Sequence, residues 1–535
     1  MFSAVQSKRL MDLTLWSILT VALTFTSIAA AQTTNHQIRA LSLKECLQLA
    51  LAHNLDIQID RYSPQISQYL LNAAYGAYDP TLNLTAQRSF VDEPAQFNPK
   101  KYPLPEEIKQ QSVRINSEYE LTVDSVGPAL GGHLPSGLSY NLFARSDHLN
   151  ATTFPSAQDL ALAAGMLALP PAQTNDYYAT AGITLSQPLL KNAWIDIRRR
   201  NIQINKQNLK ISELALKANI MTILTSVITS YYDLVFAREQ VNVEKKALEL
   251  AGRLLEDTRL KVKAGTMTPL DETQAEADVE TIRTALFAAE QNYSQRENIL
   301  KNLLTEQYQS WMDVGILPSE TLSVPDLPAN RTVSWVNALT KRPDLEELRL
   351  DLERQNILVR FSYNQLFPNL DLFGSYGWQA VERGFSGSWN TISDGSNPFY
   401  SVGVVFSIPL GNITARNEYK ASQAARKMAM LRLQQLQNTI FTEVDTAVKL
   451  VETTYKQISS THKAGEAAEA ALEARVMEFN AGTTNSFFVL EAQRNLIRAR
   501  SAEIRALADY NIALAKLALS EGTTLEKNQI TLKTK

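Results

Sequence analysis

Side chains that commonly carry catalysis or bind metal ions are few in this chain and stand far apart. Its one cysteine, Cys46, excludes an internal disulfide and a thiolate metal cluster. No Gly-rich loop of the P-loop pattern is present to bind a nucleotide phosphate. No nucleophile stands with a base, so we expect neither an enzyme nor a cofactor. Five histidines lack metal-ligand spacing and are expected to be solvated or locally hydrogen-bonded: His36, His53, His133, His148 and His462.

Composition and the first residues limit the class of protein. Charged residues make up 20% of the chain and the formal net charge is −3, which does not suggest a nucleic-acid partner. Residues 1–31 combine a basic start, a short apolar core and a small-residue end, as in a secretory signal peptide, although an N-terminal membrane anchor is the alternative. No later apolar run has the length of a membrane-spanning helix. An exported chain of this kind is either soluble or crosses a membrane as strands.

Long helices dominate the chain. From Pro188 to Leu304 the composition favours helix, with a break at 264–266. Before the break, apolar residues recur in steps of three and four, the spacing of a coiled-coil seam: Ile220, Leu224, Val227, Tyr231 and Leu234. About 70 helical residues extend roughly 100 Å. Such a helix has to lie against other long helices.

The same unit occurs twice. The break Ala264-Gly265-Thr266 recurs as Ala481-Gly482-Thr483, 217 residues later. The strand end at Pro188 recurs at Pro409, 221 residues later. A second seam has the same spacing: Leu433, Leu436, Ile440, Val444, Ala447, Val451, Tyr455 and Ile458. The sequence therefore predicts two internal repeats.

Strand patterns lie next to prolines at the strand–helix junctions. Four segments of about ten residues alternate apolar with small polar side chains, near Pro80, Pro188, Pro368 and Pro409. Aromatic residues gather at their far ends: Tyr177, Tyr178, Tyr376, Trp378, Phe399 and Tyr400. This pattern is typical of a membrane β-barrel, although a soluble hairpin also alternates. Four strands cannot close a barrel and lipid forbids open edges, so several copies have to pool their strands.

The expected order of segments follows from these patterns. The first repeat, 32–304, has an opening helix with a kink or break at Pro64, a strand hairpin with an insertion at 91–176, and the long helical hairpin. Within the insertion, 115–123 and 138–143 are possible strands that either extend a barrel or form a surface hairpin. Residues 305–342 form a crossover, 343–520 the second repeat and 521–535 a tail that packs with the crossover against the helices.

The mature chain resembles the TolC-like outer-membrane efflux protein family. The matching features are Leu41-Ser42-Leu43, Asn54-Leu55, Arg342-Pro343-Asp344-Leu345, the Ser-x-Pro-Leu strand ends and the two Gly-Thr turns. The resemblance implies an α+β membrane protein in which a homotrimer pools four strands per chain into a twelve-stranded barrel. Long helices would continue this barrel as a hollow coiled-coil cylinder in the periplasm. It also implies an exit duct of a tripartite efflux pump or type I secretion system, with a periplasmic adaptor and an inner-membrane transporter as partners.

The resemblance also locates a gate just past the two turns. The family's acidic positions fall on Asp271, Phe488 and Glu491, so one acidic ring would be aromatic here. We expect Glu491, aided by Asp271, to form a cation-favouring constriction, the alternative being ordinary solvated carboxylates. The positions of the family's closing latch hold Phe479 and Thr484 instead of tyrosine and arginine, so a different latch is expected. The exposed tips would meet the adaptor, or end helices, or do both: Gly265, Thr266, Gly482 and Thr483.

A second class of function stays open at this stage. An exported coiled-coil spacer without a channel would also need long paired helices. Alternating strands with aromatic ends argue against it, because a spacer needs no lipid-facing band. Membrane fractionation separates the two, since a spacer washes off and a barrel requires detergent.

Overall fold

A computed structural model describes residues 37–93, 119–153, 172–320, 322, 324 and 330–531. The predicted signal peptide, 1–31, lies outside the described residues. The chain divides into two compact units, one of Met1–Gln58, Ile220–Lys341 and Glu443–Lys535, the other of Ile59–Asn219 and Arg342–Thr442. Each unit therefore takes segments from both predicted repeats.

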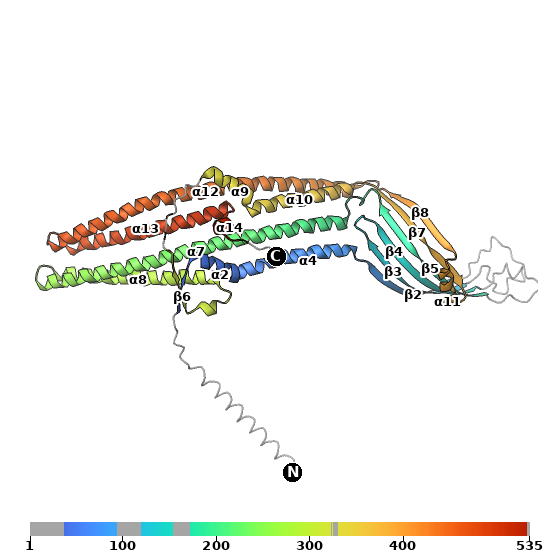
Figure 1. The fold of residues 1–535 in the computed structure, drawn as a ribbon, viewed down its shortest axis with the longest axis horizontal. Coiled ribbons are helices and arrows are strands. Elements are labelled where there is room, and N and C mark those ends of the chain that lie inside the picture. The colour runs from blue at the N-terminus through green and yellow to red at the C-terminus, as the bar shows by residue number, and fades with distance from the viewer. Residues whose placement is uncertain are drawn as a thin grey trace, which may run out of the picture. The chain divides into compact units, whose positions relative to one another are not determined.

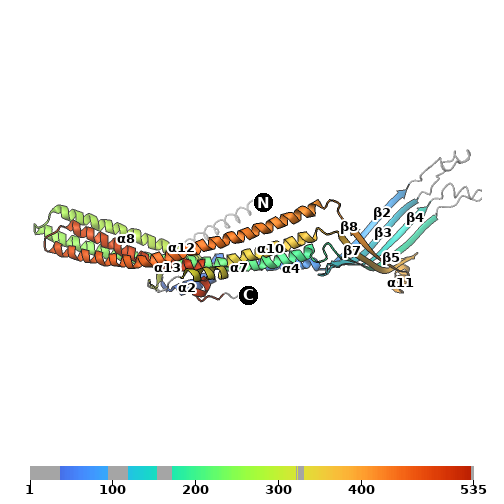
Figure 2. The same ribbon diagram turned by 90° about the horizontal axis from the view of Figure 1, so that it is seen from above.

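Four long helices form two hairpins (Figures 1 and 2). The first pairs α7 (Ile197–Lys263) with α8 (Pro269–Leu304), and the second pairs α12 (Ile413–Asn480) with α13 (Ser486–Ser520). The predicted seam of α7 is a core, because Ile220 is 3% exposed and its other four residues are fully buried. In the second seam Ile440, Val444, Ala447 and Val451 are buried, whereas Tyr455 is exposed. The period of three and four thus predicted which faces pack.

The opening helix is broken into three, but not at the proline. The pieces are α2 (Leu43–His53), α3 (Leu55–Asp60) and α4 (Tyr62–Tyr75), followed by the turn η1 (Gly76–Tyr78). Ser42 begins α2 with a capping box, in which Ser42 and Glu45 exchange hydrogen bonds. The prediction of a break at Pro64 was wrong because this residue lies in the first turn of α4, where the missing N–H has no intrahelical partner to lose.

The crossover is tied to the first unit by a small sheet and by the tail. Strand β1 (Gln37–Leu41) pairs in parallel with β6 (Val314–Pro318), which follows η2 (Tyr308–Trp311). The buried Tyr231 hydroxyl on α7 donates to the Leu41 carbonyl, 3.2 Å away, and burial raises the pKa of Tyr231 to about 12. Helix α9 (Arg331–Lys341) meets the tail, which holds α14 (Thr524–Lys527), through Ser334 and Glu521. The expected packing of crossover and tail is therefore present.

Six strands of the second unit form one sheet. Their order is β2 (Thr81–Glu93), β3 (Tyr119–His133), β4 (Ser139–Thr153), β5 (Ala172–Pro188), β7 (Asn369–Glu382) and β8 (Pro398–Ser407), with every neighbour antiparallel. The insertion therefore adds two strands between β2 and β5, and four strands per chain was wrong. The two possible strands were placed too short, since Gly131 and Gly132 lie inside β3 rather than in a turn.

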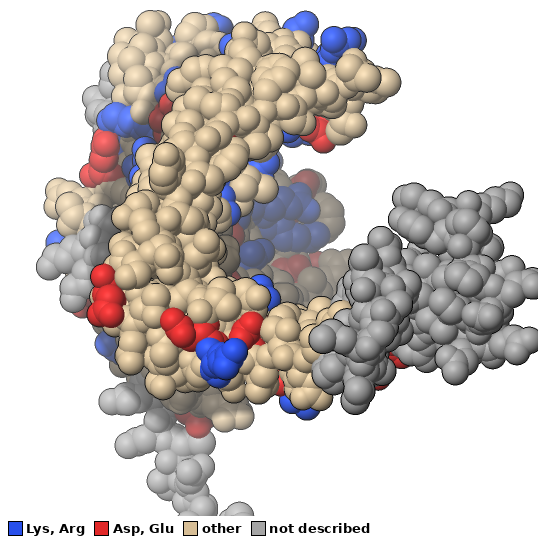
Figure 3. Space-filling view, turned by 90° about the vertical axis from the view of Figure 1, so that its right-hand side faces the viewer, with Lys and Arg blue, Asp and Glu red and all other residues tan. Residues whose placement is uncertain are grey.

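The two faces of the sheet differ in chemistry. One row across the strands is apolar: Leu82, Leu130, Leu142, Ile183, Tyr376 and Tyr400. Many side chains on this face are exposed, such as Leu84 at 75% and Val402 at 76%. The opposite face carries small polar side chains, among them Asn141, Thr184, Ser375 and Ser401. From the side on which the sheet lies, the nearest surface is largely uncharged (Figure 3).

Two helices of the second unit accompany the sheet. Helix α10 (Pro343–Asn364) leads into β7, and α11 (Phe385–Ser393) connects β7 to β8. Helix α11 packs on β5 and β7 and was not predicted from the sequence. Contrary to the expectation of no span, α7 holds a stretch long and apolar enough to cross a membrane, but 56% of that stretch is buried within the chain. A mostly buried core helix passes the same test.

Candidate gate at the tips of the helical hairpins

The two Gly-Thr turns have the same backbone. Gly265 has φ of 73° and Gly482 has φ of 74°, a left-handed conformation that glycine adopts without strain. Each following threonine donates its backbone N–H and its hydroxyl to the carbonyl oxygen five residues earlier, at 2.9 Å for Thr266 and 3.0 Å for Thr483. These bonds satisfy carbonyls left open at the helix end. No described atom lies within 4 Å of a Cβ added at either glycine, so the conformation selects glycine there.

Asp271 is engaged by its own helix. Its carboxylate accepts the Thr268 backbone N–H at 3.0 Å and the Thr268 hydroxyl at 2.7 Å. This arrangement caps the first turn of α8, where backbone N–H groups lack intrahelical partners and a negative charge is favourable. Asp271 is half-buried as a result.

The second hairpin presents a different set of side chains past its turn. Phe488, at the place equivalent to Asp271, is 44% exposed and packs edge-on against Phe487. The Arg475 guanidinium lies 5.5 Å from the Phe488 ring centre and is paired with Glu478 at 2.7 Å. Glu491, one turn further along α13, is exposed and makes no hydrogen bond or ion pair with any described residue. Of the two carboxylates, only that of Glu491 is free.

Phe479 joins the two hairpins. It is 3% exposed and belongs to a core cluster with Leu254 of α7 and with Val489 and Leu490 of α13. The ammonium group of Lys261, near the end of α7, donates to the Phe479 carbonyl at 2.8 Å and lies 3.5 Å from the ring centre. A cation over an aromatic face is attracted by the ring quadrupole. Sequence reasoning missed this contact, although Lys261 stands opposite in charge to Glu478, its equivalent in the second hairpin.

Thr484, the other latch position, is half-buried and follows the turn that Gly482 begins. Deeper between the hairpins, Arg494 of α13 lies 3.7 Å from Asp278 of α8. Burial raises the pKa of Asp278, with Arg494 opposing the shift. Buried charge between α8 and α13 is thus paired, in contrast to the free carboxylate of Glu491.

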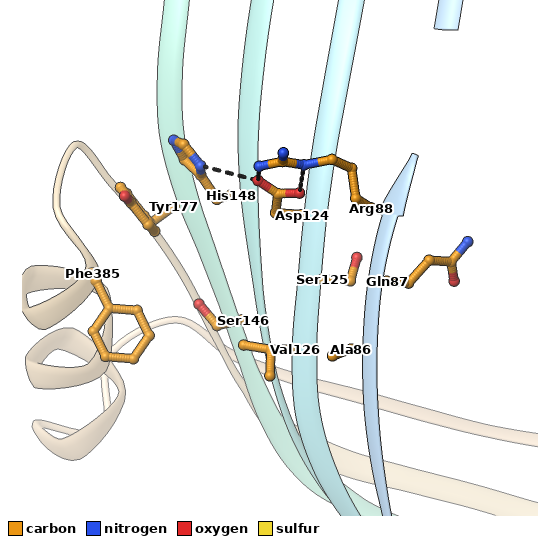
Figure 4. A pocket seen from close by; sticks show the side chains of 10 residues that line it. All are labelled: Ala86, Gln87, Arg88, Asp124, Ser125, Val126, Ser146, His148, Tyr177 and Phe385. Carbon is orange, nitrogen blue, oxygen red and sulfur yellow. Dashed lines mark hydrogen bonds and ion pairs between the residues drawn. The ribbon is translucent and has the colours of Figure 1, made fainter. Parts of the chain in front are cut away.

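A hollow on the apolar face of the sheet is the other candidate site (Figure 4). It measures about 520 Å³, and Phe385 of α11 forms one wall. The Arg88 guanidinium binds both oxygens of Asp124, at 2.5 and 2.7 Å, and a His148 ring nitrogen lies 4.0 Å from the same carboxylate. These charges neutralise one another and no nucleophile faces a base. Among the described residues no group of three or more His, Cys, Asp or Glu side chains is arranged to hold a metal ion.

Solved structures share this fold at low sequence identity. The CmeC outer membrane channel of Campylobacter jejuni aligns with a TM-score of 0.62 and 18% identity, covering 90% of this chain and 86% of CmeC. The outer membrane protein VceC of Vibrio cholerae aligns with a TM-score of 0.62 and 16% identity, covering 90% of this chain and 96% of VceC. The fold is therefore that of the TolC-like outer-membrane channels.

The sequence itself defines the family. The family described as outer membrane efflux protein matches residues 145–306 and 335–523, and the chain belongs to it. Its place is accordingly the outer membrane, as expected from the resemblance.

Individual relatives are more distant. The pyoverdine export outer membrane protein OpmQ of Pseudomonas aeruginosa is 25% identical over 302 residues, which cover 56% of this chain and 60% of OpmQ. The outer membrane protein TolC of Escherichia coli is 23% identical over 324 residues, covering 58% of this chain and 63% of TolC. The chain thus spans about three fifths of the length of these curated relatives. They are named for export or the outer membrane rather than as enzymes.

Proposed function

We propose that the chain is the outer-membrane exit duct of a tripartite efflux pump or type I secretion system. Three copies form a passive channel that binds no cofactor and catalyses no reaction. The observation that carries the proposal is the sheet: in a chain of the outer membrane efflux family, it exposes an apolar face, turns a polar face the other way and leaves two edges unpaired. An aqueous duct spares a polar cargo the cost of entering hydrocarbon.

The periplasmic end of the duct is gated by the hairpin tips. Three copies of Glu491 line the mouth and favour cations, while Phe488 narrows it by bulk. Support comes from the exposure of both side chains and from the absence of any partner of Glu491 among the described residues. Asp271 contributes less to the mouth, because its carboxylate is held by Thr268. The contact between Lys261 and Phe479 takes the place of the expected latch.

The adaptor docks on the tips and connects the duct to the inner-membrane transporter. The four turn residues are all exposed: Gly265, Thr266, Gly482 and Thr483. Their backbone conformation is fixed by glycine and by threonine hydrogen bonds, which gives a partner a rigid surface to recognise.

Extraction and reconstitution test the proposal. The exported protein should stay with the outer membrane in high salt and alkali, require detergent, have the mass of three chains and conduct ions in a planar bilayer. A protein that washes off without detergent and does not conduct would instead be the periplasmic spacer. Co-purification after cross-linking in cells should recover an adaptor with a helical hairpin.

A further inference from the structure

The sheet has two unpaired edges that suit each other. Counting from β2 to β8, the chain contributes six antiparallel strands, so the first and last run in opposite directions. When identical copies stand side by side, β8 of one meets β2 of the next in antiparallel pairing. An odd number of strands would force a parallel seam. Unpaired backbone groups facing lipid have no water to bond, so both edges need this partner.

We propose that three copies close an eighteen-stranded barrel, rather than the twelve-stranded one that the resemblance implies. This inference rests on the proposed trimeric duct and concerns its width. The added strands are full members of the wall. Pairing of β4 with β5 runs unbroken from Ser139↔Ser186 to Thr153↔Ala172, and the Arg88–Asp124 ion pair joins β3 to β2.

The register of the sheet fits closure at this number. A row of directly paired residues runs from Thr81 at the start of β2 to Ser401 on β8: Thr81, Gly131, Asn141, Thr184, Ser375 and Ser401. Strand β8 ends six residues later, at Ser407, where the chain turns back toward the helices. If every copy starts β2 level with the end of β8, one chain shifts the register by 407 − 401 = 6 residues and three chains by 18.

A shift of eighteen residues around eighteen strands sets the tilt. With a rise of about 3.4 Å per residue and about 4.8 Å between strands, the strands incline about 35° to the barrel axis. Membrane barrels have tilts of about 35–45°. The register of one chain and the strand number of three therefore agree, which neither observation requires alone.

The consequence is a wide outer pore. At this tilt and strand spacing, eighteen strands give a backbone diameter of about 34 Å, against about 22 Å for twelve. The cross-section inside the backbone is therefore about twice as large. Its inner face carries small uncharged polar side chains, such as Asn141, Thr184 and Ser375. The barrel then sets no size limit for cargo, and selection by size falls to the helical mouth.

Cryo-electron microscopy of the full-length protein in detergent decides the strand number. We expect three chains and eighteen strands in the wall. Three chains with twelve strands in the wall, and β3 and β4 outside it, would overturn the inference and leave the duct intact. A monomeric protein without a pore would instead overturn the proposed function.

Disulfide cross-linking tests the seam independently. Thr85→Cys, Gln87→Cys and Ser89→Cys on β2 are each combined with Ser401→Cys on β8, all on the polar face. The six-residue shift places Ser401 opposite Gln87 of the next copy, so Q87C with S401C should give covalent trimers under oxidation. The control is Ser375→Cys on the interior strand β7, which should give none with Q87C. A stable detergent trimer in which no pair cross-links would contradict the proposed seam.

Discussion

The tips of the two helical hairpins have one backbone and two different sets of side chains. Their glycines differ by 1° in φ, and the threonines that follow make the same hydrogen bonds. Past the turn, however, the first hairpin uses Asp271 to cap its own helix, and the second exposes Phe488 and Glu491. The turn demands a left-handed residue, so duplication preserved it, whereas the exposed positions were free to diverge.

The tips also differ in the charge they present to each other. Lys261 in the first hairpin and Glu478 in the second occupy equivalent places. Lys261 reaches across to Phe479, whereas Glu478 stays within its own helix and pairs with Arg475. The first hairpin therefore supplies the connection, and the second supplies the free charge and the aromatic bulk.

Removing the Phe479 ring should have the largest effect. Phe479→Ala leaves a cavity between the hairpins and costs about 3–5 kcal/mol of local packing. We expect a higher open probability in single-channel recordings and greater drug sensitivity of cells that carry an active pump. Val262→Ala, the equivalent change in the half-buried position of the first hairpin, is the matched control and should leave the recordings unchanged. Equal effects of both variants would show that the tips are interchangeable.

Lys261→Met should produce a smaller opening of the same kind. It keeps most of the side-chain length but removes the ammonium group from the carbonyl and the ring of Phe479. Because the site is only half-buried, we expect a cost of about 1–2 kcal/mol. Lys263→Met removes an exposed charge two residues away and serves as control. If the two variants conduct alike, net charge rather than the contact controls the mouth.

Charge removal should separate the two carboxylates. Glu491→Gln should lower the ratio of cation to anion permeability, measured as the reversal potential in a salt gradient. Asp271→Asn should change this ratio less and instead loosen the first turn of α8, at about 1 kcal/mol, seen as faster amide exchange there. A larger selectivity change for D271N than for E491Q would reverse the assignment.

The smallest expected effect distinguishes the hairpins by pH. His462 of α12 hydrogen-bonds Glu503 of α13 at 2.6 Å, and this bond, with Glu466 nearby and Arg500 opposing, holds the pKa of His462 above its usual value of 6.5. A raised pKa in the fold means that the contact stabilises fully below pH 6.5 and is lost as pH rises through the raised value. The equivalent Lys245 pairs with Glu290 in the first hairpin and keeps its charge.

Thermal unfolding followed by circular dichroism at pH 6 and pH 8 measures this difference. His462→Gln should reduce the drop in midpoint between the two pH values, and Lys245→Gln should leave the drop unchanged. An undiminished drop in H462Q would assign the pH dependence to other groups.

Periodicity predicted the long helices and their buried faces because a seam of threes and fours has one solution in a coiled coil. Glycine and threonine marked both tips for a similar reason, since few residues adopt the turn conformation. The strand number was wrong because β3 and β4 alternate too weakly to be told from a surface hairpin, and only the register shows them inside the sheet. The contact between Lys261 and Phe479 joins helices 218 residues apart, which no local pattern reports.

The parallel pairing of β1 with β6 affects the order in which the chain can fold. Gln37 at the front of the described chain has to wait for Val314 before its backbone bonds are satisfied. While the polypeptide is still emerging from the inner membrane, its leading end therefore has no partner, and closing so long a loop is slow. A chain truncated before residue 314 should leave that end exposed to periplasmic chaperones and proteases, so quality control can recognise an unfinished molecule by its first strand.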